Sequence, residues 1–460
     1  MTVVARAALP VARRGFLLAG AAAALVPIAV WIGRAPLTLP LVVACGGILF
    51  AAVVLRAEAG LIIVIGSMLL SPEIALGSAG HGGLEASRSV VLRTEDLILM
   101  LVGFAWLARM AIHKDLGAVR RTSLNGAIGA YVACCLLSTL LGIEAGRLHP
   151  AVALCYVLKY VEYFFIFFIT VNYVRTPRQM ERLLAALLVT AALITLYAWW
   201  QIPSGARPSA PFEGATGEPN TLGGYLVLIF SIACALALEA PNSRVRTACG
   251  LLCAAIVPAL LATLSRSSWL AFLASLGALV LLLPRRTRLL GAATAGAVLL
   301  CLFMPGRIED RLAYTFTSTA SASESLQVGR LHLDTSSSAR IASWSAALQG
   351  WKQHPVLGWG VTGFGFLDAQ YFRVLVEIGL VGFLAFSVLV LACLRAFRRA
   401  RATLRAPVAR ALAAGMLAGL AGILVHSIGT NTFLLIRIME PFWMLTGLVI
   451  AATGIEAEAS

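Results

Sequence analysis

Charged side chains are scarce in this sequence. Asp, Glu, Lys and Arg together make up 12% of its 460 residues, whereas about 25% is typical of soluble domains. Apolar residues account for 60% of the chain, and the mean hydropathy is +0.90. A water-soluble fold of this size could not bury so much apolar surface, which excludes soluble Rossmann and TIM-barrel enzymes as well as disordered and collagen-like chains. The composition predicts an all-α, polytopic integral membrane protein.

Cysteine is absent from the polar segments of the chain. All nine cysteines lie in apolar stretches, and no spacing between them matches a metal-ligand pattern. Free cysteine in such surroundings behaves as a small apolar side chain, so we expect helix packing and no disulfide framework. The sequence also lacks a phosphate-binding P-loop and an acidic pair at metal-ligand spacing. We therefore expect a protein that uses no metal or other cofactor.

Long apolar stretches are present throughout the chain. A helix that crosses the hydrocarbon core needs about 20 apolar residues, and on that basis we expect about 12 to 14 transmembrane helices. The candidate spans are 15–33, 37–55, 59–71, 96–112, 125–143, 151–172, 183–201, 221–240, 248–263, 268–283, 289–305, 371–395, 410–427 and 438–453. The third of them is short enough to be broken or re-entrant. The first lacks a small-residue cleavage site, so we expect it to be retained rather than removed as a signal peptide.

The basic residues indicate how the spans are oriented. Most of the 36 Lys and Arg residues lie in short loops that fall on one side of the membrane if the spans alternate in direction. Because such loops are cytoplasmic, we expect both termini in the cytoplasm and the long loops 72–95, 202–220 and 306–370 outside. The net charge of +15 thus reflects orientation in the bilayer and not nucleic-acid binding. The chain divides into a helix bundle over 1–305, a large outer loop over 306–370 and C-terminal helices over 371–460.

The large outer loop contains an amphipathic segment. Between residues 339 and 351, apolar side chains recur at spacings of three, four and three: Ile341, Trp344, Leu348 and Trp351. This pattern is typical of one helix face, and tryptophan favours the membrane–water interface. We expect a helix that lies on the outer leaflet or enters it, rather than an unstructured loop.

Three polar features interrupt or border the apolar stretches. Asn220 is placed to cap the helix after a Gly- and Pro-rich loop, and Glu218 just precedes it; backbone amides at such a helix start can hold phosphate. Arg266 lies between two apolar stretches, where an arginine is costly unless it meets an anion or a water-filled cavity. The alternative for Arg266 is snorkelling to lipid headgroups. Lys159 and Glu162 are three residues apart, and we expect them to pair with each other in a structural role.

Four segments in a fixed order resemble a known family. They are GATGEPNTLGGYL, LSRSSWLAF, HPVLGWGVTGFG and DAQYFRVLVEIGLVGFLAF, with the large outer loop between the second and the third. This order, over about residues 195–395, resembles the O-antigen ligase and O-antigen polymerase superfamily. Members of that superfamily are bacterial inner-membrane glycosyltransferases, which use sugars carried on undecaprenyl diphosphate.

The resemblance assigns roles to several residues. Arg266 corresponds to the arginine of the family's Ser-Arg motif, and Arg340 to the arginine before the Pro-x-x-Gly-x-Gly stretch. Both would bind the diphosphate of the lipid carrier, and Arg207 in the second outer loop is a third candidate for this role. Further matching positions, which would support the motifs, are Pro219, Asn220, Tyr371, Leu375, Glu377 and Gly379.

One departure from the family bears on the chemistry. Ligases of the family carry a His-Asn pair before the next helix, whereas this chain has Asp368 and Ala369 there. Of its six histidines, only His354 lies near that position in the loop, and it stays a candidate. We expect Asp368, or otherwise Glu218, to accept the proton of the acceptor hydroxyl. The departure favours a polymerase over a ligase.

The resemblance thus implies a metal-independent glycosyltransferase of polysaccharide biosynthesis at the periplasmic face of the inner membrane. Its substrates would be an undecaprenyl-diphosphate-linked glycan and an acceptor glycan or lipid, with inversion at the anomeric carbon. A chain-length regulator and a flippase are candidate partners. The alternatives are a ligase that transfers the glycan to lipid A core or another acceptor, a polysaccharide transporter or flippase, and a scaffold for glycan assembly.

Overall fold

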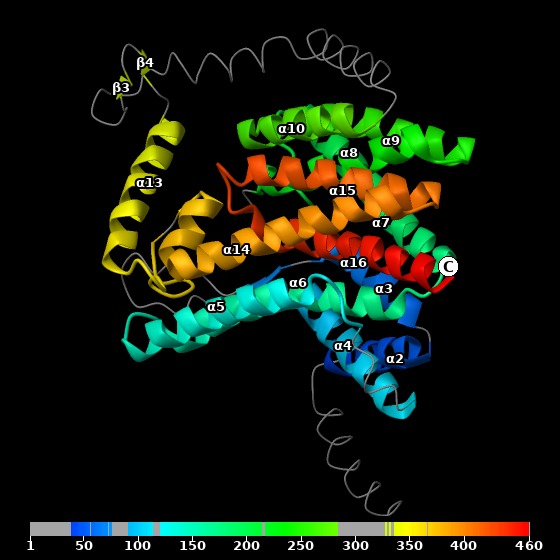
Figure 1. Cartoon of the computed structure of the whole chain (residues 1–460), viewed down its shortest axis with the longest axis horizontal. Coiled ribbons are helices and arrows are strands. Elements are labelled where there is room, and N and C mark those ends of the chain that lie inside the picture. The colour runs from blue at the N-terminus through cyan, green and yellow to red at the C-terminus, as the bar shows by residue number, and fades with distance from the viewer. Residues whose placement is uncertain are drawn as a thin grey trace, which may run out of the picture.

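The computed structural model describes residues 38–55, 57–71, 73–75, 91–113, 120–213, 217–283, 327–328, 331–332, 335–365 and 367–459. Most of these residues are α-helical (Figure 1). The helices are α2 (Thr38–Leu55), α3 (Ala57–Leu70), α4 (Thr94–His113), α5 (Asn125–Glu144), α6 (Pro150–Tyr173), α7 (Pro177–Gln201), α8 (Pro219–Glu239), α9 (Ser243–Ala262), α10 (Arg266–Leu282), α13 (Thr335–Gln353), α14 (Gln370–Thr403), α15 (Pro407–His426) and α16 (Ile436–Ala459). Short 3-10 turns are η2 (Ile202–Ser204) and η3 (Thr432–Leu434). Two short antiparallel strand pairs join β1 (Glu73–Ala75) to β2 (Val91–Arg93) and β3 (Gln327–Val328) to β4 (Leu331–His332).

These helices agree with the spans expected from the sequence. Every candidate span within the described ranges coincides with a helix, and the spans at 15–33 and 289–305 lie outside those ranges. In the described part of the chain, eight helices are long and apolar enough to cross a membrane: α5, α6, α7, α8, α9, α14, α15 and α16. Helices α3 and α10 are apolar but shorter. The chain is therefore a multi-pass membrane protein of the all-α class.

Helix α15 packs closely against α8 and α10 (Figure 1). Glycines on α15 permit the close approach. A Cβ on Gly415 would lie 2.6 Å from the Cα of Ile232 on α8, and one on Gly422 would lie 3.0 Å from the carbonyl oxygen of Ala271 on α10. Gly415 and Gly419 form a GxxxG pattern, which membrane helices use because small residues let two backbones meet. This packing holds the start of α10 near the end of α15.

Helix α6 packs along α16 and also reaches α4. The buried Trp443 of α16 lies against the Phe164 ring of α6 in an edge-on contact, with centroids 4.7 Å apart. Lys159 of α6 pairs with Glu162 at 3.3 Å, which confirms the expected pair. Lys159 also pairs with Asp96 of α4. Since both carboxylates hold the lysine, its role in the described structure is to join α6 to α4.

Helix α14 is broken at Gly379, whose φ of 69° and ψ of −170° are not helical. Within a membrane such a break leaves backbone groups that need partners elsewhere. The segment 355–360, here called the 355–360 loop, supplies them. The four hydrogen bonds are Trp359 N to Val376 O (3.0 Å), Gly360 N to Glu377 O (2.8 Å), Leu380 N to Pro355 O (2.9 Å) and Val381 N to Val356 O (3.1 Å).

Glycine is required on both sides of this contact. A Cβ on Gly358, which has a φ of 71°, would lie 2.5 Å from the carbonyl carbon of Glu377 and 2.6 Å from the nitrogen of Gly379. A Cβ on Gly379 would overlap the carbonyl oxygen of Val356. The Pro-x-x-Gly-x-Gly motif therefore joins the 355–360 loop to the break in α14.

Helix α13 is the helix that the sequence predicts in the large outer loop, but the face that it buries differs from the predicted one. Trp344 stacks on Phe372 of α14 with ring centroids 5.3 Å apart, and Ala347 is buried beside it. Ile341 and Leu348, expected on the same face, are 38% and 39% exposed. The tryptophan side of the helix thus packs on protein, because the broken start of α14 presents apolar side chains to it.

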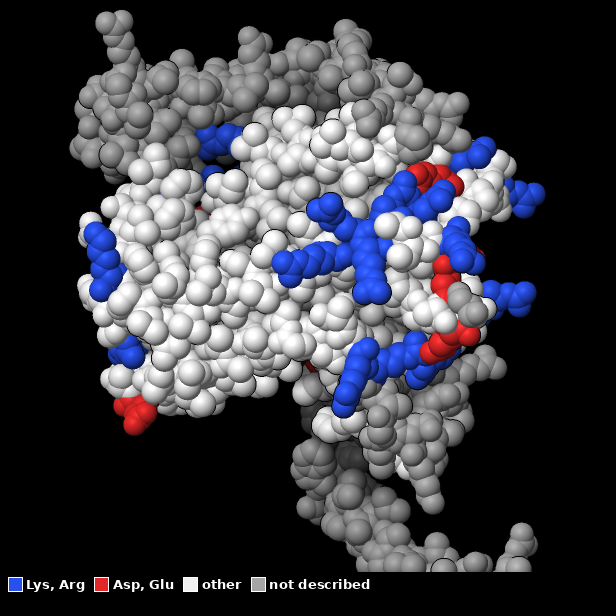
Figure 2. Space-filling view, viewed as in Figure 1, with Lys and Arg blue, Asp and Glu red and all other residues white. Residues whose placement is uncertain are grey.

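The helix ends gather at two faces of the bundle. Helices α8, α10, α14 and α16 begin at one face, which we call the site end, and α7, α9 and α15 finish there. The opposite face, the basic end, carries many arginine side chains and lies at the right in Figure 2, where the C-terminus is drawn in Figure 1. Its exposed arginines include Arg244, Arg246, Arg395, Arg398, Arg399, Arg405 and Arg410.

Candidate functional site

Arg266 is the first residue of α10, which begins at a tight turn. The Ser265 side chain caps the helix by accepting a hydrogen bond from the Ser268 amide at 3.3 Å, a role that serine often has at helix starts. Leu264 before it has a positive φ of 50°, which is uncommon for a residue other than glycine. The turn and the cap together hold Arg266 at the site end.

Arg207 lies beside the same turn. Its Nε donates a hydrogen bond to the carbonyl of Thr263 at 2.7 Å, and the side chain is otherwise exposed. This bond ties the segment after α7 to the turn before α10. Two of the three arginines that the sequence predicts to bind diphosphate therefore lie at one turn of the chain.

Arg340 reaches this region from α13. A Cβ on Gly429 would lie 2.6 Å from Ser267 Oγ and 3.6 Å from Arg340 Nη1. Gly429 thus leaves the space in which both side chains approach the turn after α15. Ser267 follows Arg266 directly, so Arg340 and the first turn of α10 approach the same glycine, although α13 and α10 are far apart in the sequence.

Asp368 is half-buried just before α14. The Asn431 side-chain amide donates to its Oδ1 at 3.4 Å. Burial raises the pKa of the Asp368 carboxyl above its ordinary value, although the positive charges of Arg340 and Arg373 act to lower this pKa. The residue predicted as the base therefore lies within electrostatic range of Arg340. A carboxylate with a raised pKa is a stronger proton acceptor than an exposed one.

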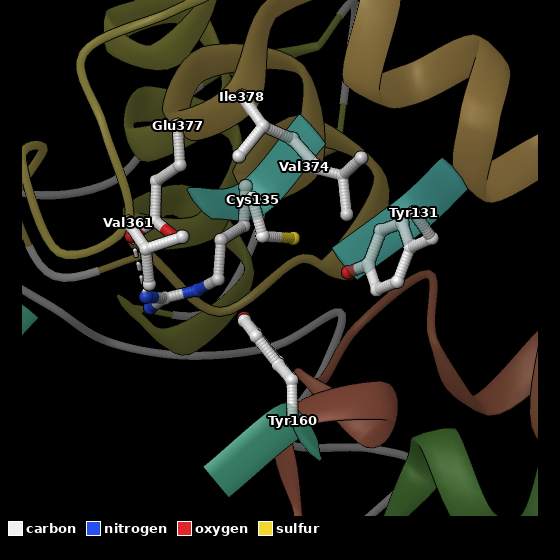
Figure 3. Close-up of a pocket in the computed structure, with 8 residues that line it drawn as sticks. Tyr131, Cys135, Tyr160, Val361, Val374, Glu377 and Ile378 are labelled. Carbon is white, nitrogen blue, oxygen red and sulfur yellow. Dashed lines mark hydrogen bonds and ion pairs between the residues drawn. The ribbon is translucent and has the colours of Figure 1, made fainter. Parts of the chain in front are cut away.

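Arg373 links Asp368 to the interior of the bundle. Its Nη1 pairs with Glu377 Oε1 at 3.1 Å, its Nη2 donates to the Leu367 carbonyl at 2.7 Å, and its Nε donates to Asn431 Oδ1 at 3.0 Å. Glu377 is therefore the buried partner of Arg373 and lies away from solvent. The narrow pocket beside this ion pair (Figure 3) is also lined by Tyr131, Cys135, Tyr160, Val361, Val374 and Ile378.

The remaining predicted residues lie around the same end of the bundle. Pro219 is the first residue of α8, a position that proline favours, so the N-cap position is occupied by Glu218 and not by Asn220, which was expected there. Glu218 is exposed and accepts a hydrogen bond from the Thr221 hydroxyl at 3.1 Å. The Tyr371 hydroxyl donates to the Leu424 carbonyl at 2.6 Å and so holds α14 against α15. Pro219 and Tyr371 thus have structural contacts, whereas Glu218 is accessible.

Glu213, which the sequence analysis did not single out, orders the loop that carries Glu218. Its Oε2 accepts hydrogen bonds from the amides of Ala210 and Glu218 at 3.1 and 3.0 Å. Burial raises the pKa of the Glu213 carboxyl to about 7, although the nearby Arg437 acts to lower it. Arg437 is itself buried and donates to the Pro211 carbonyl at 2.7 Å. This loop is therefore anchored to the start of α16.

Two histidines differ in their surroundings. His354, the one kept as a candidate, packs edge-on against Trp359 with ring centroids 4.6 Å apart and so belongs to the 355–360 loop. His426 is fully buried at the end of α15 and hydrogen-bonds Ser268 Oγ at 3.1 Å and Thr432 Oγ1 at 2.8 Å. His426 lies far from the large outer loop in the sequence, so it was not predicted as a site residue. The cluster of polar residues in HSIGTNT at the end of an apolar stretch was the signal that could have found it.

Asn431 is a second residue that the sequence reasoning missed. Its amide nitrogen donates to the Leu367 carbonyl at 2.6 Å as well as to Asp368, while its oxygen accepts from Arg373. The turn between α15 and α16 therefore contacts both the start of α10 and the start of α14. In the described part of the chain, no group of three or more His, Cys, Asp and Glu side chains could hold a metal ion.

Comparison with known proteins identifies one domain. Residues 249–387 match the model of the O-antigen ligase family. The matched segment contains Arg266, Arg340 and Asp368, whereas Asn220 and His426 lie outside it. None of the curated proteins compared with the chain matches it.

Proposed function

We propose that this membrane protein, whose residues 249–387 are a domain of the O-antigen ligase family, is a glycosyltransferase that polymerises glycan repeat units carried on undecaprenyl diphosphate. The family match supports a ligase or polymerase type of function in glycan assembly. In our proposal the acceptor is a second glycan, and the product stays attached to a lipid carrier.

The observation that carries the proposal is the meeting of Arg340, the start of α10 and Asp368 at the site end. Arg340 and Ser267, which follows Arg266, both approach Gly429, and the charge of Arg340 also acts on Asp368. Arginine suits a diphosphate ligand because its planar guanidinium donates two parallel hydrogen bonds and stays charged. Glycan transfer from a diphosphate needs cations that stabilise the leaving group and a base that accepts the proton of the acceptor hydroxyl. The arginines and Asp368 bring both together at the site end.

The reaction in this proposal is a single displacement. Asp368 accepts the proton of the acceptor hydroxyl, whose oxygen bonds to the anomeric carbon of the donor sugar. The bond between that carbon and the diphosphate oxygen breaks, and its electron pair leaves on the diphosphate. Arg266, Arg340 and Arg207 stabilise the negative charge that develops there. Attack opposite the leaving group inverts the anomeric carbon.

The orientation of the protein follows from its two ends. The arginines of the basic end lie at helix ends and in the short connections between spans, which supports a cytoplasmic position for that end. In our proposal the protein lies in the bacterial inner membrane with both termini in the cytoplasm. The site end then faces the periplasm, where lipid-linked glycan is available.

A ligase is the second candidate function, favoured by the description of the matched family. The chemistry at the donor would be the same, and only the acceptor would differ. Asp368 in place of the histidine of the family's ligases favours the polymerase. Glu218, which is exposed near Asn220, is the alternative base.

The test of the donor site replaces its arginines. We expect Arg340→Ala and Arg266→Ala each to lower glycan transfer by about 100-fold, because each removes a charged donor to the leaving diphosphate. Lys352→Ala, which removes an exposed cation from the same helix as Arg340, is the matched control and should leave transfer unchanged. The measurement is polymer length and yield in the native host, together with turnover of purified protein on lipid-linked repeat units. Normal polymer with the arginine variants correctly inserted would overturn the proposal.

A further inference from the structure

A chain of buried hydrogen bonds runs from the turn after α15 to the start of α8. Its links are Thr432 Oγ1 to His426 Nδ1 (2.8 Å), His426 Nε2 to Ser268 Oγ (3.1 Å), Ser268 Oγ to Ser265 Oγ (2.8 Å) and Ser265 Oγ to Asn220 Oδ1 (2.7 Å). His426, Ser268 and Thr432 are completely buried. These hydrogen bonds therefore connect α15, α10 and α8, which are far apart in the sequence.

Two serines set the direction of the hydrogen bonds that end at Asn220. The hydroxyls of Thr430 and Thr432 both lie 2.8 Å from His426 Nδ1. The other ring nitrogen, Nε2, bonds to Ser268 Oγ. Ser268 donates to Ser265, and Ser265 donates to the side-chain oxygen of Asn220. Each hydroxyl has one hydrogen, so the Ser265 hydrogen is used in the bond to Asn220.

The end of the chain orients Asn220. Because the Asn220 side-chain oxygen accepts a hydrogen bond from Ser265, both N–H groups of its amide nitrogen face away from this chain of hydrogen bonds. Asn220 is half-buried at the first turn of α8, next to the serine turn that carries Arg266. An amide assignment of this kind rests on the hydrogen-bond network, and here it rests on the hydrogen bond that Ser265 donates to the Asn220 oxygen.

Helix α8 is shaped to admit this chain. A Cβ on Gly223 would overlap Ser268 Oγ, and a Cβ on Gly224 would lie 2.9 Å from His426 Cε1. Glycine inside a helix is less favourable than alanine. At these two positions the missing side chains make the space in which His426 and Ser268 meet.

We propose that His426 is a positioning residue of the anion site, which acts through Asn220. By fixing the serine turn and the Asn220 rotamer, it holds an amide donor toward the diphosphate that Arg266 and Arg340 bind. This inference rests on the proposed function and adds Asn220 as a donor to the ligand, with His426 as the residue that orients it.

Two substitutions of similar size separate this role from simple packing. In His426→Gln the side-chain amide nitrogen reaches the place of Nε2 and can still donate to Ser268. In His426→Asn the amide is too short to reach Ser268. We expect His426→Asn to raise the KM for the lipid-linked donor by about tenfold, the effect of one hydrogen bond to a charged group. His426→Gln should stay within about threefold of the original KM.

A double-substitution cycle tests whether His426 acts through Asn220. Asn220→Ala removes the proposed donor, and we expect the pair Asn220→Ala with His426→Asn to match Asn220→Ala alone. Additive effects on KM would overturn the inference, because they would mean that His426 acts by another route. If His426→Asn does not fold, Ser268→Ala breaks the same link with a smaller change and takes its place in the cycle.

A binding measurement separates this inference from the proposed function. The probe is inorganic pyrophosphate, titrated into the full-length protein in lipid nanodiscs. Weaker binding by both Arg340→Ala and Asn220→Ala supports both proposals. Weaker binding by Arg340→Ala with unchanged binding by Asn220→Ala overturns only the inference. Unchanged binding by both variants overturns the proposed function as well.

Discussion

At the scale of single residues, Asp368 differs from an exposed aspartate because two influences act on it in opposite directions. Burial disfavours its charged form, while Arg340 and Arg373 favour it, and the net pKa is raised. In the proposed reaction Asp368 has to be deprotonated to accept the hydroxyl proton. The transfer rate should therefore increase with pH as Asp368 loses its proton.

We expect the acid limb of kcat/KM for glycan transfer to have its midpoint above about 3.9, the ordinary pKa of aspartate. In Arg340→Ala the carboxyl loses a charge that lowers its pKa, so the midpoint of the residual activity should move to higher pH. The Asp368→Glu variant should still show an acid limb in its pH profile, whereas the Asp368→Asn variant should lose turnover. The measurement is the pH profile of purified protein, and an unchanged profile with Asp368→Asn would assign the proton transfer to Glu218 or another group.

At the scale of secondary-structure elements, the broken helix α14 shows why a loop motif and a helix motif occur together. Backbone groups of the 355–360 loop form hydrogen bonds with the N–H and carbonyl groups that the break at Gly379 exposes. A break without such a partner would leave polar backbone groups unpaired in an apolar setting, which costs several kcal/mol. The contact also sets where Asp368 lies, because the segment between loop and helix is short.

We expect Gly379→Ala to lower the free energy of unfolding by about 2 kcal/mol or more, since a left-handed conformation and a backbone overlap are both imposed on the new side chain. Gly365→Ala is the control, because a Cβ there meets open space and φ is not in the left-handed region. The measurement is the thermal midpoint of purified protein in detergent. Equal midpoints for the two variants would show that the junction tolerates a side chain.

At the scale of the whole molecule, the two ends of the bundle have different chemistry. The basic end has many exposed arginines, and the half-buried Arg401 at this end pairs with Glu239 at 2.5 Å. The site end brings together residues from α8, α10, α13, α14 and the turn after α15. Only one orientation in the membrane exposes the site end to a periplasmic glycan.

We expect Lys352→Cys at the site end to react with a membrane-impermeant maleimide in intact cells, and Arg398→Cys at the basic end to react only after the inner membrane is opened. Both positions are exposed, and labelling of the native cysteines is measured in the unsubstituted protein. The reverse pattern would place the site end in the cytoplasm and contradict the proposed topology. Equal labelling of both positions in intact cells would contradict the separation of the two ends.

Much of the helical architecture could be predicted because each span is a local property. A run of apolar residues forms a helix in a bilayer whatever its neighbours are, and the spans expected within the described ranges coincide with helices. The helix α13 was also predicted, but its buried face was not. Which side of α13 is covered depends on Phe372 and its neighbours in α14, and periodicity carries no information about them.

The sequence alone determined that this protein is a multi-pass helical bundle and which arginines lie at its polar borders, because hydropathy and charge act along the chain. It did not determine that His426 and Asn431 join the surroundings of Arg266, Arg340 and Asp368. Those contacts depend on how α8, α10, α14 and α15 pack, and close packing through Gly223, Gly224 and Gly429 brings distant residues within hydrogen-bonding range. Only the tertiary structure decided this arrangement, since hydrogen bonds form between neighbours in space and not between neighbours in sequence.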